Sequence, residues 1–426
     1  MGLPDSIYDN YTRILKEELI PAVGCTEPTC IAYACAETRR VLGEFPSSIT
    51  VECSGDIIKN VKGAVVPNTG NLKGIKAAAV IGAVGGDAGK GLEVLSGITP
   101  EDICRAEEIL RTDFCNVELL QTAANLHVIV TATSVNNTSL VEIIHTHTNV
   151  VRIEKNGCTI FKKPYSVENF NDSLSDRTCL NVRHIKEFAD TVELGELEKL
   201  IQLQIRLNSR ISEEGLLNIY GIGVGANLIK YYGDDIKTKA KAAAAAGSDA
   251  RMSGCILPVI TNSGSGNQGI TVSLPVIEYA KHLKVPEEVL IRALILSNLV
   301  AIHQKTEIGR LSAYCGAVSA ACGSGAGITY LHHGTYDQIC RTITNTLANV
   351  SGIICDGAKP SCAAKIASAV DAAIMAHYLS MEDRVFNSGD GIIKADVEKT
   401  IESVGKLGRY GMKETDREIL KIMLES

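Results

Sequence analysis

Helical hydrophobic patterns dominate the chain from Arg183 onward, and this feature restricts the fold most strongly. Apolar residues recur there at the spacing of an α-helix with one buried face. The predicted helices cover residues 185–208, 215–230, 286–302, 335–350 and 363–378, with an alanine-rich helix around residues 239–246. Pro286 suits the first position of its helix, where its missing N–H costs no intrahelical hydrogen bond. We therefore expect residues 166–426 to form a mainly helical domain.

Residues 45–165 carry strand patterns instead. Strands are predicted over residues 48–53, 126–133 and 139–145, and a hairpin over residues 149–162 turns at Asn156-Gly157. The Gly- and Ala-rich residues 67–91 predict a loop that leads into a tightly packed helix. Together these patterns predict an α+β protein in which a smaller α/β domain, residues 45–165, accompanies the helical one.

The first 44 residues are predicted to form two helices. Apolar residues repeat with a helical period over residues 5–20, and Pro21 ends that helix. A turn follows, and a helix of small residues is predicted over residues 29–41. We expect residues 1–44 to pack on the helical domain, and the polar residues 164–180 to connect the two domains.

Composition restricts the core and the partners of the protein. Trp is absent and aromatic residues make up 4% of the chain, so the core must consist of Ala, Val, Ile and Leu interleaved with Gly. The net charge of −7 is mixed along the chain without a basic stripe, which argues against nucleic-acid binding. Apolar runs such as residues 294–302 are too short to span a membrane, and no signal-peptide pattern is found. A cytoplasmic protein with no membrane partner is expected.

The fourteen cysteines are informative in such a compartment. They do not indicate disulfides, because cytoplasmic thiols stay reduced, and most are expected to be small buried residues. The segment from Cys355 to Cys362 differs, because Gly357 and Pro360 prevent a continuous helix between the two sulfurs. The backbone can therefore fold both sulfurs toward one centre, with free N–H groups pointing at thiolate or sulfide charge.

Two cysteines do not make a cluster site by themselves. An iron–sulfur cubane needs three or four thiolates, and the close cysteine spacings of ferredoxins and zinc ribbons are absent, which disfavours zinc. Cys315 and Cys322 are candidates for a third ligand, and a helix would place them near one face. Each also suits a small buried thiol beside Ala and Gly, so the residues alone leave this choice open.

Seven stretches in order along the chain resemble a known family. They are Pro21-Ala-Val-Gly-Cys25-Thr-Glu-Pro28, Ser54-Gly-Asp-Ile-Ile-Lys-Asn60, His145-Thr-His147-Thr-Asn149, Asp249-Ala-Arg-Met-Ser-Gly-Cys255, Asn262-Ser-Gly-Ser-Gly-Asn-Gln-Gly269, Cys315-Gly-Ala and Asp356-Gly-Ala-Lys-Pro-Ser-Cys362. In these stretches the chain resembles the L-cysteine desulfidases, relatives of the α-chain of iron–sulfur L-serine dehydratases.

The resemblance implies a [4Fe–4S] cluster held by Cys315, Cys355 and Cys362. In the dehydratases the ligands lie in a Gly-Cys-Gln-Ala-Glu segment and a later Cys-Asp-Pro…Pro-Cys segment, and these neighbours select Cys315 over Cys322. This chain has a shorter gap between its last pair. It also ends Met423-Leu-Glu-Ser426, without the cysteine that caps the fourth iron in some dehydratases.

Three thiolates leave one iron open, and this iron can act as a Lewis acid toward a leaving group. We expect elimination of sulfide from L-cysteine, which gives aminoacrylate and then pyruvate and ammonia. Pyridoxal phosphate is not needed for this reaction.

The reaction also needs a base near Cα, and Cys25 is the candidate. It lies in a Gly-Cys-Thr turn just before a predicted helix, where N–H groups and the helix dipole can lower a thiol pKa. A similar Ser-His-Thr segment in the dehydratases has His at the corresponding place. A purely structural thiol and a fourth cluster ligand in the resting enzyme remain alternatives for Cys25.

Substrate contacts are predicted from three segments. The Gly-rich segment lets a ligand approach the backbone, and Asn262, Ser263 and Asn267 supply its polar groups, although a plain turn between helices would have the same sequence. It is not a dinucleotide-binding loop, because the strand–turn–helix context is missing.

The other candidate contacts come from the α/β domain. They are Ser54, Lys59, Asn60 and His147. His145 and His147 alternate at strand spacing and should face one side, as substrate contacts or as a polar strand face. Arg251 and Asp249 are expected to form a structural pair.

Three other functions remain open from the sequence. L-serine ammonia-lyase chemistry would use the same cluster, an iron–sulfur sensor would need a fourth protein ligand, and a metal-free small-molecule binder would use its cysteines structurally. Gly- and Ala-rich surfaces suggest a homodimer.

Overall fold

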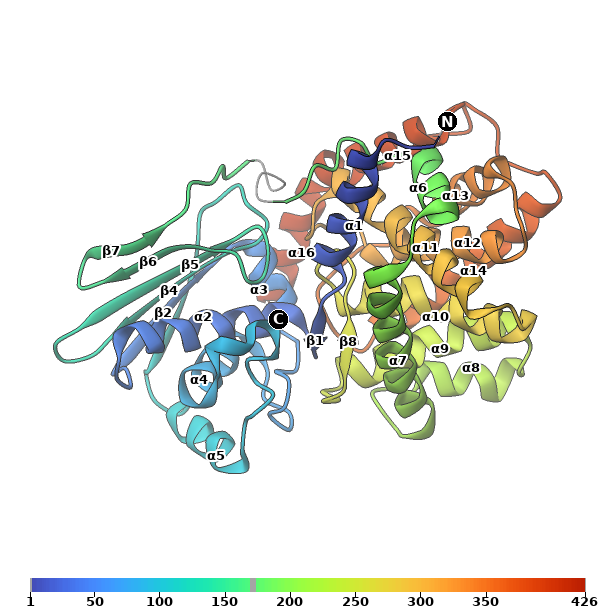
Figure 1. Cartoon of the computed structure of the whole chain (residues 1–426). Coiled ribbons are helices and arrows are strands. Elements are labelled where there is room, and N and C mark those ends of the chain that lie inside the picture. The colour runs from blue at the N-terminus through green and yellow to red at the C-terminus, as the bar shows by residue number, and fades with distance from the viewer. Residues whose placement is uncertain (1, 169–173, 426) are drawn as a thin grey trace.

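The computed structural model describes residues 2–168 and 174–425, and it confirms the α+β class. A sheet with helices against one face forms one part of the molecule, and a bundle of helices forms the other (Figure 1). No helix in the described part of the chain is long and apolar enough to cross a membrane.

The large sheet has six strands in the order β3-β2-β4-β5-β6-β7. The strands are β2 (Ser48–Cys53), β3 (Cys115–Leu119), β4 (His127–Thr133), β5 (Thr138–Ile144), β6 (Val150–Lys155) and β7 (Cys158–Lys162). Among the described strands only β2 and β3 pair in parallel. The predicted hairpin β6–β7 turns at Asn156-Gly157, and both of these residues have positive φ.

One face of this sheet is covered by α2 (Thr26–Leu42) and α4 (Gly74–Gly85) (Figure 1). Alternate residues of β4, Val128 and Val130, are fully buried beneath these helices. The two helices approach closely at Gly82, where a Cβ would lie 2.3 Å from Ala32 O. Small residues are therefore what allow this layer to pack so closely. Shorter elements complete this part: α3 (Gly55–Val61), a 3₁₀ turn (Ala88–Glu93) and α5 (Pro100–Ile109).

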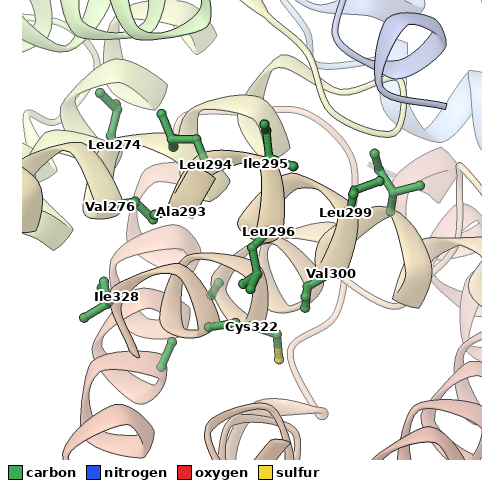
Figure 2. Packing of buried hydrophobic residues seen from close by; sticks show 14 of the residues in the cluster. Leu274, Val276, Ala293, Leu294, Ile295, Leu296, Leu299, Val300, Cys322 and Ile328 are labelled. Atoms are coloured by element: carbon green, nitrogen blue, oxygen red, sulfur yellow. The ribbon is translucent and has the colours of Figure 1, made fainter. Parts of the chain in front are cut away.

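The helical part is built around α11 (Glu287–Ile308). Figure 2 shows Leu294, Leu296 and Val300 of this helix packed with residues of the neighbouring helices α10 and α12. The surrounding helices are α1 (Asp5–Glu18), α6 (Val182–Thr191), α7 (Gly195–Leu217), α8 (Val224–Tyr232), α9 (Ile236–Met252), α10 (Gly266–Leu283), α12 (Gly316–Leu331), α13 (Tyr336–Val350), α14 (Cys362–Met381), α15 (Val397–Lys406), a π-helical turn (Leu407–Gly411) and α16 (Lys413–Glu425). Cys322 of α12 is completely buried in this core (Figure 2).

A two-stranded ribbon joins the N-terminal region to the helical part. β1 (Pro21–Val23) pairs antiparallel with β8 (Pro258–Ile260), and Pro21 lies opposite Ile260. Each strand runs directly into a segment that the sequence singled out, the turn at Cys25 and the Gly-rich segment. The ribbon therefore brings residues more than 230 positions apart into one place.

The structure corrects four sequence predictions. The helices of residues 1–44 do not pack together on the helical domain, because α1 joins the helical core whereas α2 packs on the sheet. The predicted helix 185–208 is two helices, α6 and α7. The helix predicted at 215–230 is interrupted between Leu217 and Val224, where Gly221 and Gly223 have positive φ. Pro286 occupies the N-cap, one position before α11 begins.

Candidate functional site

A cavity of about 760 Å³ lies where segments from both parts of the molecule meet. Eight residues predicted from the sequence line it: Cys25, Asn60, His147, Ser263, Asn267, Cys315, Cys355 and Cys362. They come from the ends of helices and from loops of both parts. The fold therefore brings eight of the eleven predicted site residues together in space, including all four predicted cysteines.

Backbone pairing places two of the cysteines side by side. Cys355 N donates to Ala313 O over 2.6 Å, and Cys315 N donates to Ile353 O over 3.1 Å. An antiparallel bridge between Tyr314 and Ile354 lies between these bonds. Cys315 is the N-cap of α12, and Cys362 is the first residue of α14, so both sulfurs are near helix N-termini, where negative charge is favoured.

The loop from Cys355 to Cys362 lies against α3. Gly357 has a φ of +94°, and a Cβ there would be 2.5 Å from Lys59 O. Glycine is thus required both by the backbone conformation and by the close approach to α3. Lys359 and Lys365 both pair with Asp356, which closes the loop from outside.

Burial opposes the ionisation of Cys315 and Cys362. Together with the adjacent Cys355 and Cys362, burial raises the pKa of Cys315 to about 12. Burial also raises the pKa of Cys362. Binding of a metal would therefore have to displace protons from these sulfurs.

Cys25 is the N-cap of α2, and its Sγ donates to Glu27 Oε2 over 3.1 Å. The prediction of a lowered thiol pKa is wrong, because burial and the negative charge of Glu27 raise the pKa of Cys25 well above its usual value. Although burial opposes its ionisation, Glu27 has its pKa lowered to about 2 by His147, Cys25 and Arg251. His147 Nε2 is 3.7 Å from Glu27 Oε1.

The two histidines of the β5 segment do not face one side. β5 ends at Ile144, and His145 has a φ of +67°, so strand alternation no longer applies there. His147 lines the site cavity, whereas His145 lines a second cavity and contacts Ser166 O through Nε2 at 2.7 Å.

The Gly-rich segment turns tightly into α10. Asn262 is completely buried and donates to Asn298 Oδ1 over 3.0 Å, so it supports the turn rather than the cavity. Ser263 Oγ donates to Asn262 Oδ1 over 2.9 Å. Asn267 Oδ1 accepts a hydrogen bond from Arg251 Nη1 over 3.1 Å.

Ser54 and Lys59 lie outside the site cavity and line a cleft beside α16. Ser54 Oγ donates to Asn125 O over 2.6 Å. Lys59 is 1% exposed and pairs with Asp56 over 2.8 Å and with Asp416 of the C-terminal helix. The ammonium group of Lys59 is therefore held between two carboxylates outside the site cavity.

Comparisons with known proteins identify the family of the chain. The family described as serine dehydratase alpha chain matches residues 79–421, which is most of the chain and includes the three grouped cysteines. The chain belongs to the serine dehydratase alpha chain family. This family relation confirms the resemblance found in the sequence, and it indicates a lyase-type enzyme.

Several bacterial relatives are similar to this chain over nearly their whole length. A UPF0597 protein of Lachnoclostridium phytofermentans is 57% identical, covering 98% of this chain and 100% of the relative. A UPF0597 protein of Treponema denticola is 52% identical over 100% of both chains. One of Fusobacterium nucleatum is 45% identical over 96% of this chain and 97% of its own length.

Sequence reasoning missed several polar residues that line the cavity. Among them are Glu27, Arg251, Gln268, Lys305 and Arg310. Glu27, Arg251 and Gln268 lie inside the stretches that carry the family resemblance, and this was the signal that could have found them. Arg251 was expected to pair with Asp249, but the carboxylate of Asp249 instead accepts from Gly225 N over 3.0 Å.

No sequence pattern singled out Lys305 and Arg310, apart from their position shortly before Cys315. Lys305 is almost completely buried, and burial lowers its pKa to about 8, although Cys355 and Cys315 oppose this shift. Among the described lining residues, three cations thus face one carboxylate, that of Glu27.

Proposed function

We propose that the protein is a [4Fe–4S]-dependent L-cysteine desulfidase that works without pyridoxal phosphate. Three thiols in one cavity are the observation that carries the proposal: Cys315, Cys355 and Cys362. The family relation supports a lyase that uses an iron–sulfur cluster, and the choice of L-cysteine is our inference.

The residues of the cavity fit such a cluster. Thiolates are the ligands of iron–sulfur clusters, and Lys305 lies close enough to Cys315 and Cys355 for their charges to act on it. In the described part of the chain, four buried polar atoms without a hydrogen-bond partner belong to lining residues: Asn60 Oδ1, His147 Nε2, Arg251 Nε and Gln268 Oε1. Unpaired buried polar atoms are rare in proteins, and a bound ligand, an ion or a water can supply the partner that these four atoms need.

The site is not built for a single ion. No group of three or more His, Cys, Asp or Glu side chains converges closely enough for one metal ion within residues 2–168 and 174–425. The ligands of a cubane bind different irons, so they can be further apart than the ligands of one tetrahedral zinc.

The chain's own residues would divide the reaction as follows. When bound by the three cysteines, the cluster supplies an open Lewis-acidic iron for the sulfur that leaves. Once its own thiol proton has passed to Glu27, Cys25 would remove the proton from Cα. The electron pair of that C–H bond would form the Cα–Cβ double bond, and the electron pair of the Cβ–S bond would leave with sulfur. Glu27 would hold the thiol of Cys25 in place through its hydrogen bond. The free aminoacrylate then hydrolyses to pyruvate and ammonia.

Deamination of L-serine is the second candidate, and the name of the matching family favours it. Both reactions remove the same Cα proton and differ in the group that leaves Cβ. The cavity residues described above serve either substrate.

Anaerobic reconstitution with iron and sulfide tests the proposal. The cluster absorption, sulfide release and pyruvate formation are measured with L-cysteine and with L-serine. We expect about four irons per chain and faster turnover of L-cysteine. Failure to form a cluster would overturn the proposal, a cluster without turnover would favour a sensor, and faster L-serine turnover would favour the dehydratase.

A further inference from the structure

Arg310 lies in the wall between the site cavity and a second, larger cavity. The second cavity has a volume of about 1200 Å³ and is lined by residues of both parts of the molecule, including His145 and Lys413. Arg310 and Ser312 line both cavities. The guanidinium is therefore a boundary group that a ligand in either cavity can reach.

Glu18, at the C-terminal end of α1, holds this guanidinium. Arg310 Nη2 donates to Glu18 Oε1 over 2.8 Å, and Arg177 Nη2 donates to the same oxygen over 2.6 Å. The Glu18 side chain is only 4% exposed. Burial would raise its pKa, but the charges of Arg310 and Arg177 hold it below the ordinary value. A buried ionised carboxylate fixed by two arginines is a rigid support.

Gly264 lies close to Nη1, the other terminal nitrogen of the same guanidinium. A Cβ at Gly264 would lie 2.7 Å from Arg310 Nη1 and 3.1 Å from His147 Cε1. Gly264 has a φ of +78°, so both its conformation and its surroundings require glycine. Arg310 therefore presents Nη1 to the Gly-rich segment inside the site cavity, beside His147.

The other two cations of the cavity lie beside the predicted base and beside the predicted cluster ligands. Arg251 donates to Asn267, and its Nε is packed against Gly266, where a Cβ would be 2.3 Å away. Its charge acts on Cys25 and Glu27. Cys355 and Cys315 act on the charge of Lys305. Arg310 is thus the one of the three cations that a buried carboxylate, that of Glu18, holds in place.

We propose that Arg310 binds the substrate's carboxylate and that Glu18 is its positioning residue. The inference rests on the proposed function for the identity of the amino acid, but the carboxylate subsite itself is made by the protein chain alone. A guanidinium suits this role because its planar N–H groups can bind both carboxylate oxygens. A free α-carboxylate would then be required of every ligand.

The test uses L-alanine and L-alaninamide, which differ in that carboxylate. Their binding to the cluster-free protein is measured by calorimetry. We expect L-alanine to bind and L-alaninamide to bind at least about tenfold more weakly, because a charged hydrogen bond contributes that much. Failure of the wild-type protein to prefer L-alanine would overturn the inference.

Variants then assign the residue. In Arg310→Met the preference for L-alanine should disappear, and in Arg310→Lys it should be reduced, because the charge remains without the planar pair of donors. Circular dichroism confirms folding, and the double variant Glu18→Gln/Arg310→Met avoids leaving Glu18 buried without Arg310. An unchanged preference in both folded variants would contradict the proposal.

Glu18→Gln tests positioning, and Glu17→Gln is its matched control. Glu17 accepts hydrogen bonds from Ser175 and Arg177, but Arg310 donates to Glu18. We expect about a threefold to tenfold loss of L-alanine affinity in Glu18→Gln and none in Glu17→Gln, with L-alaninamide binding unchanged in both. Equal losses of affinity for L-alanine and L-alaninamide would show that Glu18 has only a structural role.

The same variants separate this inference from the proposed function. If L-alanine binds through Arg310 but the reconstituted protein turns over neither L-cysteine nor L-serine, the proposed function fails and the subsite stands. If turnover is observed and Arg310→Met keeps the wild-type preference, the subsite fails and the function stands.

Discussion

The thiol of Cys25 donates a hydrogen bond to Glu27 Oε2 over 3.1 Å, two residues further along the same chain. Glu27 keeps its charge, with a pKa of about 2, because the effects of His147, Cys25 and Arg251 outweigh that of burial. The proton therefore stays on sulfur in the metal-free protein. Cys25 must lose it before it can accept a proton from a substrate.

Glu27→Gln should lower kcat for L-cysteine by about 10- to 100-fold, the range of general acid–base effects, while KM changes little. The amide keeps the shape of the side chain but cannot take up the proton that Cys25 must lose before it acts as a base. Exchange of the substrate's Cα proton with solvent deuterium should slow in parallel. Glu37→Gln is the control, because Glu37 is also buried on α2 but pairs with Arg40. A variant with wild-type kcat would contradict this role.

Cys315→Ala should abolish the cluster absorption, whereas Cys322→Ala should keep it. Cys315 lines the cavity with Cys355 and Cys362, and Cys322 is completely buried in the helical core. Removing the buried sulfur should cost about 1 kcal/mol of unfolding free energy, measured by denaturant titration. Loss of the cluster in Cys322→Ala with retention in Cys315→Ala would reverse the assignment.

Gly357→Ala should prevent stable cluster binding. The new Cβ would meet Lys59 O at 2.5 Å, and the φ of +94° is unfavourable for alanine. Iron content after anaerobic reconstitution and desalting measures the effect. Gly352→Ala should behave as wild type, since nothing lies within 4 Å of a Cβ there. Equal iron content in the two variants would show that the loop tolerates displacement.

Lys59→Met should strongly destabilise the fold. Lys59 is buried between Asp56 and Asp416, and its loss leaves two neighbouring carboxylates without their cation. A loss of about 3–5 kcal/mol is typical when one partner of a buried ion pair is removed. Asp416→Asn should cost less and leave KM for L-cysteine unchanged, because this cluster of charges lies outside the site cavity. An increased KM in Asp416→Asn would indicate that Lys59 contacts the substrate.

His377 should make stability depend on pH. Burial and the adjacent His332 lower its pKa from 6.5 to about 3. The unfolded chain therefore binds a proton that the folded chain excludes between these values, so stability falls as pH decreases through that window. In His377→Asn, the slope of unfolding free energy between pH 4 and 6 should decrease by up to about 1.4 kcal/mol per pH unit.

The exposed His333 provides the control for this measurement. His333→Asn should leave the slope unchanged, because that ring faces solvent in the folded and the unfolded chain alike. An unchanged slope in His377→Asn as well would assign the pH dependence to other groups.

Local patterns predicted much of the fold. The strand at β2, the turn at Asn156-Gly157 and the helices α11, α13 and α14 follow from the spacing of apolar residues and from turn-forming residues. The break between α7 and α8 was missed, since apolar residues continue through it. Only the glycines at positive φ show where the backbone leaves the helix.

The chain's own residues determined that this is an α+β protein with small residues in its core, and that Cys355 and Cys362 flank a loop rather than a helix. These properties depend on residues that are close together in the sequence, so local sequence patterns predict them. The packing of α2 on the sheet, the raised pKa of Cys25 and the place of Lys59 were decided by tertiary structure. Each depends on burial or on a charge from a distant or unrecognised neighbour, such as Asp416 for Lys59. Such contacts form only when the β1–β8 ribbon and the 313–355 pairing have closed the chain around one cavity.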